Sequence, residues 1–526
     1  MKTYLPSVNP LLLLGIGLAI VLGGILWLRL HPFLSLILGA FAVGGLTSID
    51  NIQKSLAAKY EGDNFRKAVS SEVKTEITNL KQDGQPFDEA QIREQVRAKL
   101  KEAQTPFIKA ANERATTESK QNLLQRITGA FGTTCGKIGI LIAMACVIGR
   151  CMLASGAAER IVRAALSVVG IKGAPVAFCC SSFLLGIPVF FDSLFLLAIP
   201  LVKATWLKIK KNYVLFVVAL VAGGTMTHSL VPPTPGPLFV AEELGVNLGT
   251  MILAGMAIGV FCSASGLAYA YWINNRMDIP LRETPEALKK LEELADRDLN
   301  ELPSLGLALL PILLPVALIS GVTIYKSGLD PTITIHPILN LLGDKNIALT
   351  LAAALAMLLA ASRLKDRKAL ADHVQQAMME GGLIILICCA GGAFGAMLQQ
   401  SGIGPHISGM MGSEPLDFAL LPLAFVVTAV IRGAQGSATV AMFTAVAIVG
   451  SLVTDLEALS FHPVFLAVAI GCGSKPFPWM NDSGFWVISK MSGMTEKETL
   501  KALTPMATIM GLTGIIVTMI AAKLFS

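Results

Sequence analysis

The chain has 526 residues, of which 53% are hydrophobic and only 15% are charged, and its mean hydropathy is +0.64. A soluble core cannot hide this much apolar sequence, so the composition excludes an ordinary soluble globular protein. We attribute the net charge of +6 to basic residues in loops rather than to nucleic-acid binding. The nine cysteines lack metal-ligand or paired spacing and are interpreted as small core residues.

Apolar stretches of about the membrane-spanning length, roughly 20 residues, recur along the chain and predict an all-α polytopic membrane protein. The first stretch lacks a basic region leading to a small-residue cleavage site, so we interpret it as a retained span and not as a signal peptide. The main stretches are Leu11–Leu28, Ile138–Leu153, Gly306–Tyr325, Ile347–Ala361, Leu383–Leu398 and Met506–Ala522.

Residues 51–126 interrupt this pattern with a polar segment that has the periodicity of amphipathic helices. One apolar stripe consists of Val69, Val73, Ile77 and Leu80, and a second of Ile92, Val96 and Leu100. The signals for helix boundaries are the turn Asp83–Pro86, a capping box of Asp88 with Gln91, a staple of Phe87 with Ile92, and Thr105-Pro106 at a third start. We predict a small extramembrane domain of helices.

A second charged segment, residues 274–303, is interpreted as a solvated cytoplasmic linker, with a helix predicted from Pro285 to Asp298. The predicted organisation is the first two spans (1–50), the helical insertion (51–126), the core of a first repeat (127–273), the linker (274–303) and a second repeat (304–526).

The segment Gly473–Phe485 places helix breakers, Lys475 and Asp482 inside apolar sequence. Backbone freed by Pro and Gly at membrane depth must be satisfied by neighbours or by a water-filled cavity, and a charge there is costly enough to indicate a function. Broken helices with polar contents are how secondary transporters build binding sites near the membrane midplane. The segment therefore predicts a transporter site.

The two halves of the chain share a few matching positions at a shift of 246 residues. The shift places Ser155-Gly156 over Ser401-Gly402, Gly149 over Gly395, Ile161 over Ile407, Gly186–Ser193 over Arg432–Thr439, and Pro232 over Pro478. Each half then has a span, a hairpin and a broken helix in one order. We predict two inverted repeats that enclose a site between them.

Basic residues beside the spans predict the orientation in the membrane. If the chain starts outside, one side collects Arg29, Arg160, Arg163, Lys172, Lys203, Lys208, Lys210, Lys211, Arg363, Lys365, Arg367, Lys368, Lys490, Lys497 and Lys501. This side is predicted to be cytoplasmic, so the N-terminus and residues 51–126 are extracytoplasmic. The scheme requires re-entrant hairpins at Pro175–Leu201 and Phe418–Val449, and it leaves Arg126 and Lys137 on the outer side.

Several motifs resemble the gluconate:proton symporter (gluconate permease) family of the ion-transporter superfamily. They are Leu30–Leu34, Gly136–Gly139, Ser155–Ile161, Gly186–Asp192, His228–Pro237, Ala434–Val440 and Asn481–Trp486. The resemblance implies sugar-acid uptake across the bacterial inner membrane, inverted repeats with two re-entrant hairpins, and a homodimer with moving transport domains. The chain departs from the family in its long insertion and in the bulky Pro476–Trp479.

A sugar acid offers one carboxylate and a row of hydroxyls, so its site needs anion donors together with amide and hydroxyl groups. The segment Gln435-Gly436-Ser437-Ala438-Thr439 supplies both if it forms a hairpin tip, where a helix N-terminus aims free N–H groups at the carboxylate. The alternative for its small residues is plain helix packing. The other predicted substrate-binding residues are Arg432, Asn481, Ser483 and Thr234, and Arg432 can instead pair with a buried acid or reach an interface.

Three residues are candidates for proton coupling: Asp192, Asp482 and His228. Burial favours the neutral form of a carboxyl group, which suits a group that binds and releases a proton, and histidine titrates near neutral pH. The alternatives are an ion pair or a helix cap for the aspartates and a satisfied polar residue for the histidine. Lys475 can be a partner of a substrate carboxylate or the counter-ion of Asp482.

The favoured function is proton-coupled import of gluconate or a related sugar acid, with no cofactor and no metal. A sodium-coupled carboxylate transporter of the same superfamily is the alternative, because opened carbonyls beside Asn481 and Ser437 can hold Na⁺. An enzyme is not expected, since the sequence has neither a Gly-x-Ser-x-Gly elbow nor a His-Glu-x-x-His motif. A sensor that uses the insertion is a further class.

Overall fold

The computed structural model describes residues 8–82, 89–102, 105–284, 286, 288–289, 291, 301–328, 337–364, 366–403, 406, 418–453, 456 and 459–525. Every regular element in these ranges is helical, which confirms the predicted class. In chain order the elements are α1 (Pro10–Leu26), α2 (Pro32–Leu46), α3 (Ile49–Gln82), α4 (Glu89–Glu102), α5 (Thr105–Ser119), α6 (Leu123–Ala154), α7 (Ala157–Val169), η1 (Ile171–Gly173), α8 (Ala174–Leu185), α9 (Phe191–Ile209), α10 (Tyr213–Leu230), α11 (Pro235–Glu243), α12 (Leu248–Asn274), α14 (Leu305–Gly328), α15 (Pro337–Leu342), α16 (Lys345–Arg363), α17 (Arg367–Gln400), α19 (Leu420–Gln435), α20 (Ala438–Leu452), α21 (Val464–Gly473), α22 (Ser483–Ser492) and α23 (Glu496–Leu524).

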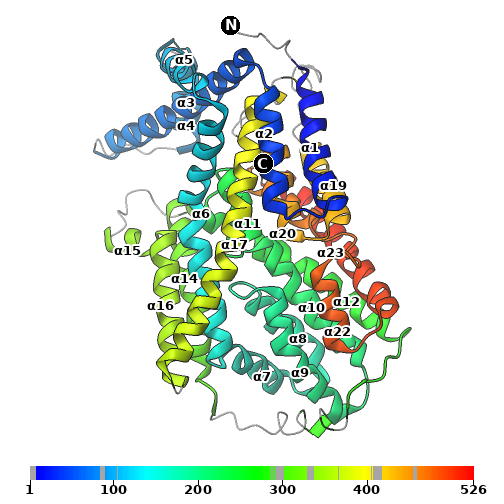
Figure 1. The fold of residues 1–526 in the computed structure, drawn as a ribbon. Helices are drawn as coiled ribbons and strands as arrows, with labels where there is room; N and C mark the ends of the chain where they lie inside the picture. The colour runs from blue at the N-terminus through cyan, green and yellow to red at the C-terminus, as the bar shows by residue number, and fades with distance from the viewer. Residues whose placement is uncertain are drawn as a thin grey trace.

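Long apolar helices make up most of the molecule. Within the described ranges, seven helical stretches are long and apolar enough to cross a membrane, or up to nine if each of two sharply bent helix pairs is one span. Helices α6 and α17 lie side by side, and α2 packs on α17 (Figure 1). A small residue allows the close approach of α2 to α17, because a Cβ atom at Gly39 of α2 would lie 3.1 Å from the ring of Phe394 of α17. The chain is thus a polytopic helical membrane protein.

The order of elements in the first half recurs in the second. Helices α8 and α19 begin 246 residues apart, α11 and α22 begin 248 apart, and so do α12 and α23. The long helices α6 and α17 end alike: Ser155 and Ser401 are their C-caps, and each is followed by a glycine with positive φ, Gly156 at 76° and Gly402 at 81°. The inversion between the halves stays a prediction.

Four helix breaks lie at the positions where the sequence places its breakers. In the first half, residues 186–190 separate α8 from α9 and residues 231–234 separate α10 from α11. In the second half, Gly436-Ser437 separates α19 from α20, and residues 474–482 separate α21 from α22. Proline has no N–H to donate and disfavours helical backbone before it, which accounts for the breaks at Pro188, Pro232 and Pro476.

The predicted insertion forms three helices, α3 to α5, that project from one end of the molecule (Figure 1). Their described residues are 49–82, 89–102 and 105–119, and residues 123–126 of the predicted insertion belong to α6. The two predicted stripes pack together, because Val69 and Val73 of α3 are buried against Ile92 and Val96 of α4. The third helix begins at Thr105, as the sequence predicts.

Some predictions lie outside the described residues. They are the turn Asp83–Pro86, the signals at Phe87 and Asp88, most of the linker helix from Pro285 to Asp298, and the match at Ile407.

Candidate functional site

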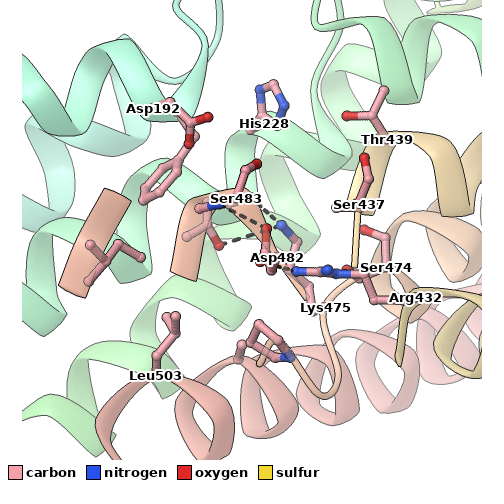
Figure 2. Close-up of a pocket in the computed structure, with 17 residues that line it drawn as sticks. Asp192, His228, Arg432, Ser437, Thr439, Ser474, Lys475, Asp482, Ser483 and Leu503 are labelled. Carbon is pink, nitrogen blue, oxygen red and sulfur yellow. Dashed lines mark hydrogen bonds and ion pairs between the residues drawn. The ribbon is translucent and has the colours of Figure 1, made fainter. Parts of the chain in front are cut away.

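A cavity of about 170 Å³ lies between the two helix breaks of the second half and the helices α9 and α10 of the first half (Figure 2). Its volume is well above the roughly 10–15 Å³ that a single water molecule needs, so a small organic molecule can enter. Seven of the predicted site residues line it: Asp192, His228, Arg432, Ser437, Thr439, Asp482 and Ser483. These residues come from both halves of the chain, so the fold brings together side chains that are up to 291 positions apart.

Three helices begin at the wall of the cavity. Asp192 belongs to the first turn of α9, Thr439 to that of α20 and Gly484 to that of α22, and all three line the cavity. Side chains cap two of these ends: the Ser437 hydroxyl accepts from the N–H of Val440 at 3.4 Å, and Asp482 Oδ1 accepts from the N–H of Gly484 at 2.9 Å. Helix N-termini carry partial positive charge and unpaired N–H groups, so the cavity wall favours an anion.

Arg432, at the end of α19, holds the second hairpin against the second broken helix. Its guanidinium pairs with the carboxylate of Asp482, donates to the carbonyl of Gly436, and donates from Nε to the carbonyl of Ser474 at 3.1 Å. The side chain is only 5% exposed. A guanidinium remains charged in proteins and presents several donors in one plane, which suits this convergence of acceptors. The predicted role of Arg432 toward a substrate carboxylate stays a prediction.

Lys475 enters the cavity from the break between α21 and α22. Its ammonium group donates to the carbonyl of Thr225 at 2.5 Å and lies 3.5 Å from the hydroxyl of the same residue. Lys475 is 6% exposed. Among the residues that the structure describes, no carboxylate forms an ion pair with it. This cation therefore bridges the broken helices of the two halves without an acidic partner.

Asp192 and His228 come from the first half of the chain. Asp192 lies near the start of α22, since a Cβ atom at Gly484 would be 3.7 Å from its Oδ1. The ring of His228 packs edge-on against Phe190, with ring centroids 6.0 Å apart. The Nδ1 atom of His228 is buried, and no hydrogen-bond partner is found for it among the described residues. Figure 2 shows both side chains on the wall that faces Ser437 and Thr439.

Four predicted substrate-binding residues do not line this cavity: Gln435, Gly436, Asn481 and Thr234. The amide of Asn481 donates to the carbonyls of Gly433 and Ala434, at 2.9 and 3.2 Å. Gly436 has a φ of 88°, and a Cβ atom there would lie 2.1 Å from the carbonyl oxygen of Asn481. The space beside Gly436 is therefore filled by the backbone of Asn481 and not by a ligand. Their substrate roles stay predictions.

The structure also places residues at the cavity that the sequence did not indicate. Thr225 contributes a hydroxyl from α10, and Ile488, Leu503 and Ala507 form an apolar wall from α22 and α23. In an apolar helix a threonine or a leucine that faces a cavity looks like one that faces a neighbouring helix. The four-residue spacing of Leu503 and Ala507 shows only that they share a helix face.

Comparisons with known proteins agree with this architecture. The model of a family described as "GntP family permease" matches residues 115–524. An uncharacterized permease of Haemophilus influenzae is 34% identical over 408 residues, which cover 76% of this chain and 83% of that protein. A gluconate permease of Pseudomonas aeruginosa is 30% identical over 398 residues, with 75% and 87% covered.

A solved structure supports the fold alone. The Neisseria gonorrhoeae protein MtrF, whose structure is titled as illuminating a class of antimetabolite efflux pumps, superposes with a TM-score of 0.56 at 15% sequence identity. The match covers 77% of this chain and 85% of that one.

The relatives are permeases and transporters, not enzymes. Because the family model matches well over half of its residues, this chain belongs to the GntP family of permeases.

Proposed function

We propose that this permease imports gluconate or a related sugar acid by proton symport across the bacterial inner membrane. The observation that carries the proposal is the cavity between the two halves of the chain, where three helix N-termini and two buried cations meet several hydroxyl groups. The P. aeruginosa relative is named a gluconate permease, and a relative from Escherichia coli is named an inner membrane permease. Both names are in keeping with the proposal.

The cavity has partners for each part of a sugar acid. Helix N-termini and basic side chains suit the carboxylate. The hydroxyls of Thr225, Ser437, Thr439 and Ser483 can donate to or accept from the sugar hydroxyls. The apolar wall that includes Leu503 can cover the carbon chain.

Of the three candidates for coupling, we favour Asp192. Asp482 already has two structural contacts, because it caps α22 and forms an ion pair with Arg432. For Asp192 no ion pair is found within the described ranges, although it lines the same cavity at the start of α9. Asp192 is half-buried and has no fixed counter-ion among the described residues, so binding and release of a proton by Asp192 require no ion pair to break.

Sodium coupling is the alternative, and it depends on which oxygen atoms of the second hairpin tip are free. A sodium ion at the second hairpin tip needs free carbonyl oxygens. The carbonyl of Gly433 already accepts from the indole of Trp479 at 2.8 Å and from Asn481, that of Ala434 accepts from Asn481, and that of Gly436 accepts from Arg432. These three backbone oxygens are therefore engaged by donors of the protein itself, whereas the side-chain oxygens Gln435 Oε1 and Asn481 Oδ1 are buried with no partner found among the described residues.

We also propose the orientation, the inverted repeats and the homodimer that the sequence analysis gives. Helices α3 to α5 lie at one end of the molecule and α7 and α9 at the other (Figure 1). The second end carries basic residues such as Arg163 and Lys208, which by the positive-inside rule supports a cytoplasmic position for this end and an outer position for the insertion.

The test is gluconate uptake into proteoliposomes that contain the purified protein. A pH gradient, acidic outside, is expected to drive accumulation without sodium, and collapse of the gradient is expected to abolish it. Asp192→Asn is expected to retain exchange of labelled for unlabelled gluconate, which moves no net proton, and to lose accumulation driven by pH. Asp482→Asn is expected to impair both, because it leaves Arg432 buried without its counter-charge. Undiminished accumulation by Asp192→Asn would rule out this residue as the coupling site, and uptake that requires sodium would favour the alternative.

A further inference from the structure

The cavity holds a closed set of titratable side chains: Asp192, His228, Arg432, Lys475 and Asp482. Arg432 and Asp482 neutralise each other in a direct ion pair. Of the ionised groups, this leaves one positive charge on Lys475 and one negative charge on Asp192. His228 is set in an apolar contact with Phe190.

Lys475 is incompletely compensated in this arrangement. An ammonium group has three N–H donors, and the partners found for Lys475 in the described part of the chain are the carbonyl and the hydroxyl of Thr225. A buried cation with only neutral partners is costly. A carboxylate that enters the cavity supplies the missing counter-charge, whereas Arg432 has no such need because Asp482 already meets it.

We propose that Lys475 is the counter-cation of the substrate carboxylate, and that the cavity is built for one negative charge per occupant. This inference rests on the proposed function and specifies its substrate class. With both aspartates ionised, the empty cavity has two positive and two negative charges. A bound monocarboxylate adds one negative charge, and one proton bound to Asp192 neutralises the negative charge of that side chain. The loaded cavity and the empty cavity therefore carry the same net charge.

Two consequences distinguish this arrangement from others. Transport of one proton with one monocarboxylate moves no net charge, so its rate depends on the pH gradient and not on the membrane potential. A dicarboxylate of the same carbon chain leaves one negative charge without a partner, so the site discriminates against it even though all its hydroxyl contacts remain.

The first experiment compares Lys475→Gln with the wild-type protein in reconstituted full-length form. The probes are gluconate and gluconamide, which has the same hydroxyls and no charge, each assayed as an inhibitor of labelled gluconate exchange. Lys475→Gln is expected to weaken gluconate binding by roughly tenfold to a hundredfold, the range for a hydrogen bond to a charged group, and to leave gluconamide binding within about twofold. Lys475→Arg keeps the charge and is expected to retain the preference for gluconate. Lys490→Gln is the matched control, because that side chain is 69% exposed.

Equal loss of gluconate and gluconamide binding in Lys475→Gln would show a packing role and would overturn the proposal, as would an unchanged preference for gluconate.

The second experiment needs no variant: the initial uptake rate of the wild-type protein is measured at constant pH gradient while potassium and valinomycin set the membrane potential. A rate that does not change with potential is expected, and one that rises steeply with inside-negative potential contradicts the charge balance. Wild-type protein that carries no gluconate at all would instead contradict the proposed function, which separates the two failures.

Discussion

Arg432 shows how one side chain can hold three parts of a membrane site together. Its guanidinium contacts the carbonyl of Gly436 in the second hairpin. It also contacts the carbonyl of Ser474 and the carboxylate of Asp482, which lie at the two ends of the break between α21 and α22. Removing one member of a buried ion pair leaves the other charge uncompensated, which typically costs about 3–5 kcal/mol. We therefore interpret the ion pair of Arg432 and Asp482 as a structural element of the cavity wall.

Ser437 and Thr439 carry a prediction at the same scale, because both hydroxyls line the cavity at the start of α20. Ser437→Ala is expected to raise the Michaelis constant for gluconate by roughly tenfold or less, as loss of one hydrogen bond to a ligand does, and Thr439→Val is expected to act similarly. Uptake kinetics in proteoliposomes measure the effect. Ser451→Ala on the same helix is the control, because its hydroxyl bonds to the carbonyl of Ile448 at 2.6 Å and lies outside the cavity lining. Unchanged constants in both site variants would assign these residues to packing.

The sequence indicated the polar residues of the cavity better than its apolar ones. Asp192, Ser437 and Asp482 stand out because a polar side chain beside a helix breaker is rare in apolar sequence. Leu503 carries no such signal, since an apolar residue suits lipid, core and cavity wall equally. The sequence alone also does not determine which residue pairs with a charged side chain. Two roles are predicted for Lys475, and only the fold shows that Asp482 forms its ion pair with Arg432.

Among the elements, the glycines of the two long helices have corresponding surroundings. Gly149 of α6 lies against the first hairpin, where a Cβ atom would be 2.7 Å from the carbonyl oxygen of Pro188. Gly395 of α17 lies against the second, where a Cβ atom would be 3.1 Å from the Cβ atom of Ala447. The 246-residue shift matches these two glycines. The sequence match therefore coincides with a shared packing role, although short motifs alone do not fix the orientation of one half relative to the other.

Gly149→Ala is predicted to displace the tip of the first hairpin, because the neighbouring atom belongs to the backbone and cannot rotate away. Overpacking of this kind costs about 1–3 kcal/mol, so we expect a lower melting temperature in detergent and slower gluconate uptake. Gly132→Ala on the same helix is the matched control, because a Cβ atom there has no neighbour within 4 Å. Equal behaviour of the two variants in both measurements would show that the contact with Pro188 does not limit the hairpin.

For the whole molecule, the outer part of the insertion is packed by its own clusters, whereas the start of α3 also packs on α17 of the membrane core. These clusters hold the insertion together: Leu56 and Tyr60 of α3 pack with Ala111 of α5, and the stripes of α3 and α4 pack farther along α3. Tyr60 also hydrogen-bonds to Glu118 and stacks under Arg114, at 4.2 Å from the ring centroid. A link to the core is the weak bond from the amide of Asn51 to the carbonyl of Ser401, at 3.4 Å.

This separation predicts that the outer part of the insertion is dispensable for transport. Because α3 and α5 pack side by side, a short Gly-Ser linker can replace residues 64–107 and leave the cluster around Tyr60 in place. The shortened protein is expected to insert normally and to take up gluconate within about twofold of the wild-type rate, since no residue of the cavity is removed. The control is a second deletion, of residues 55–120, which also removes the Tyr60 cluster and is expected to lower the melting temperature more. Normal membrane insertion with complete loss of uptake in the 64–107 deletion would show instead that α3 to α5 take part in the transport cycle.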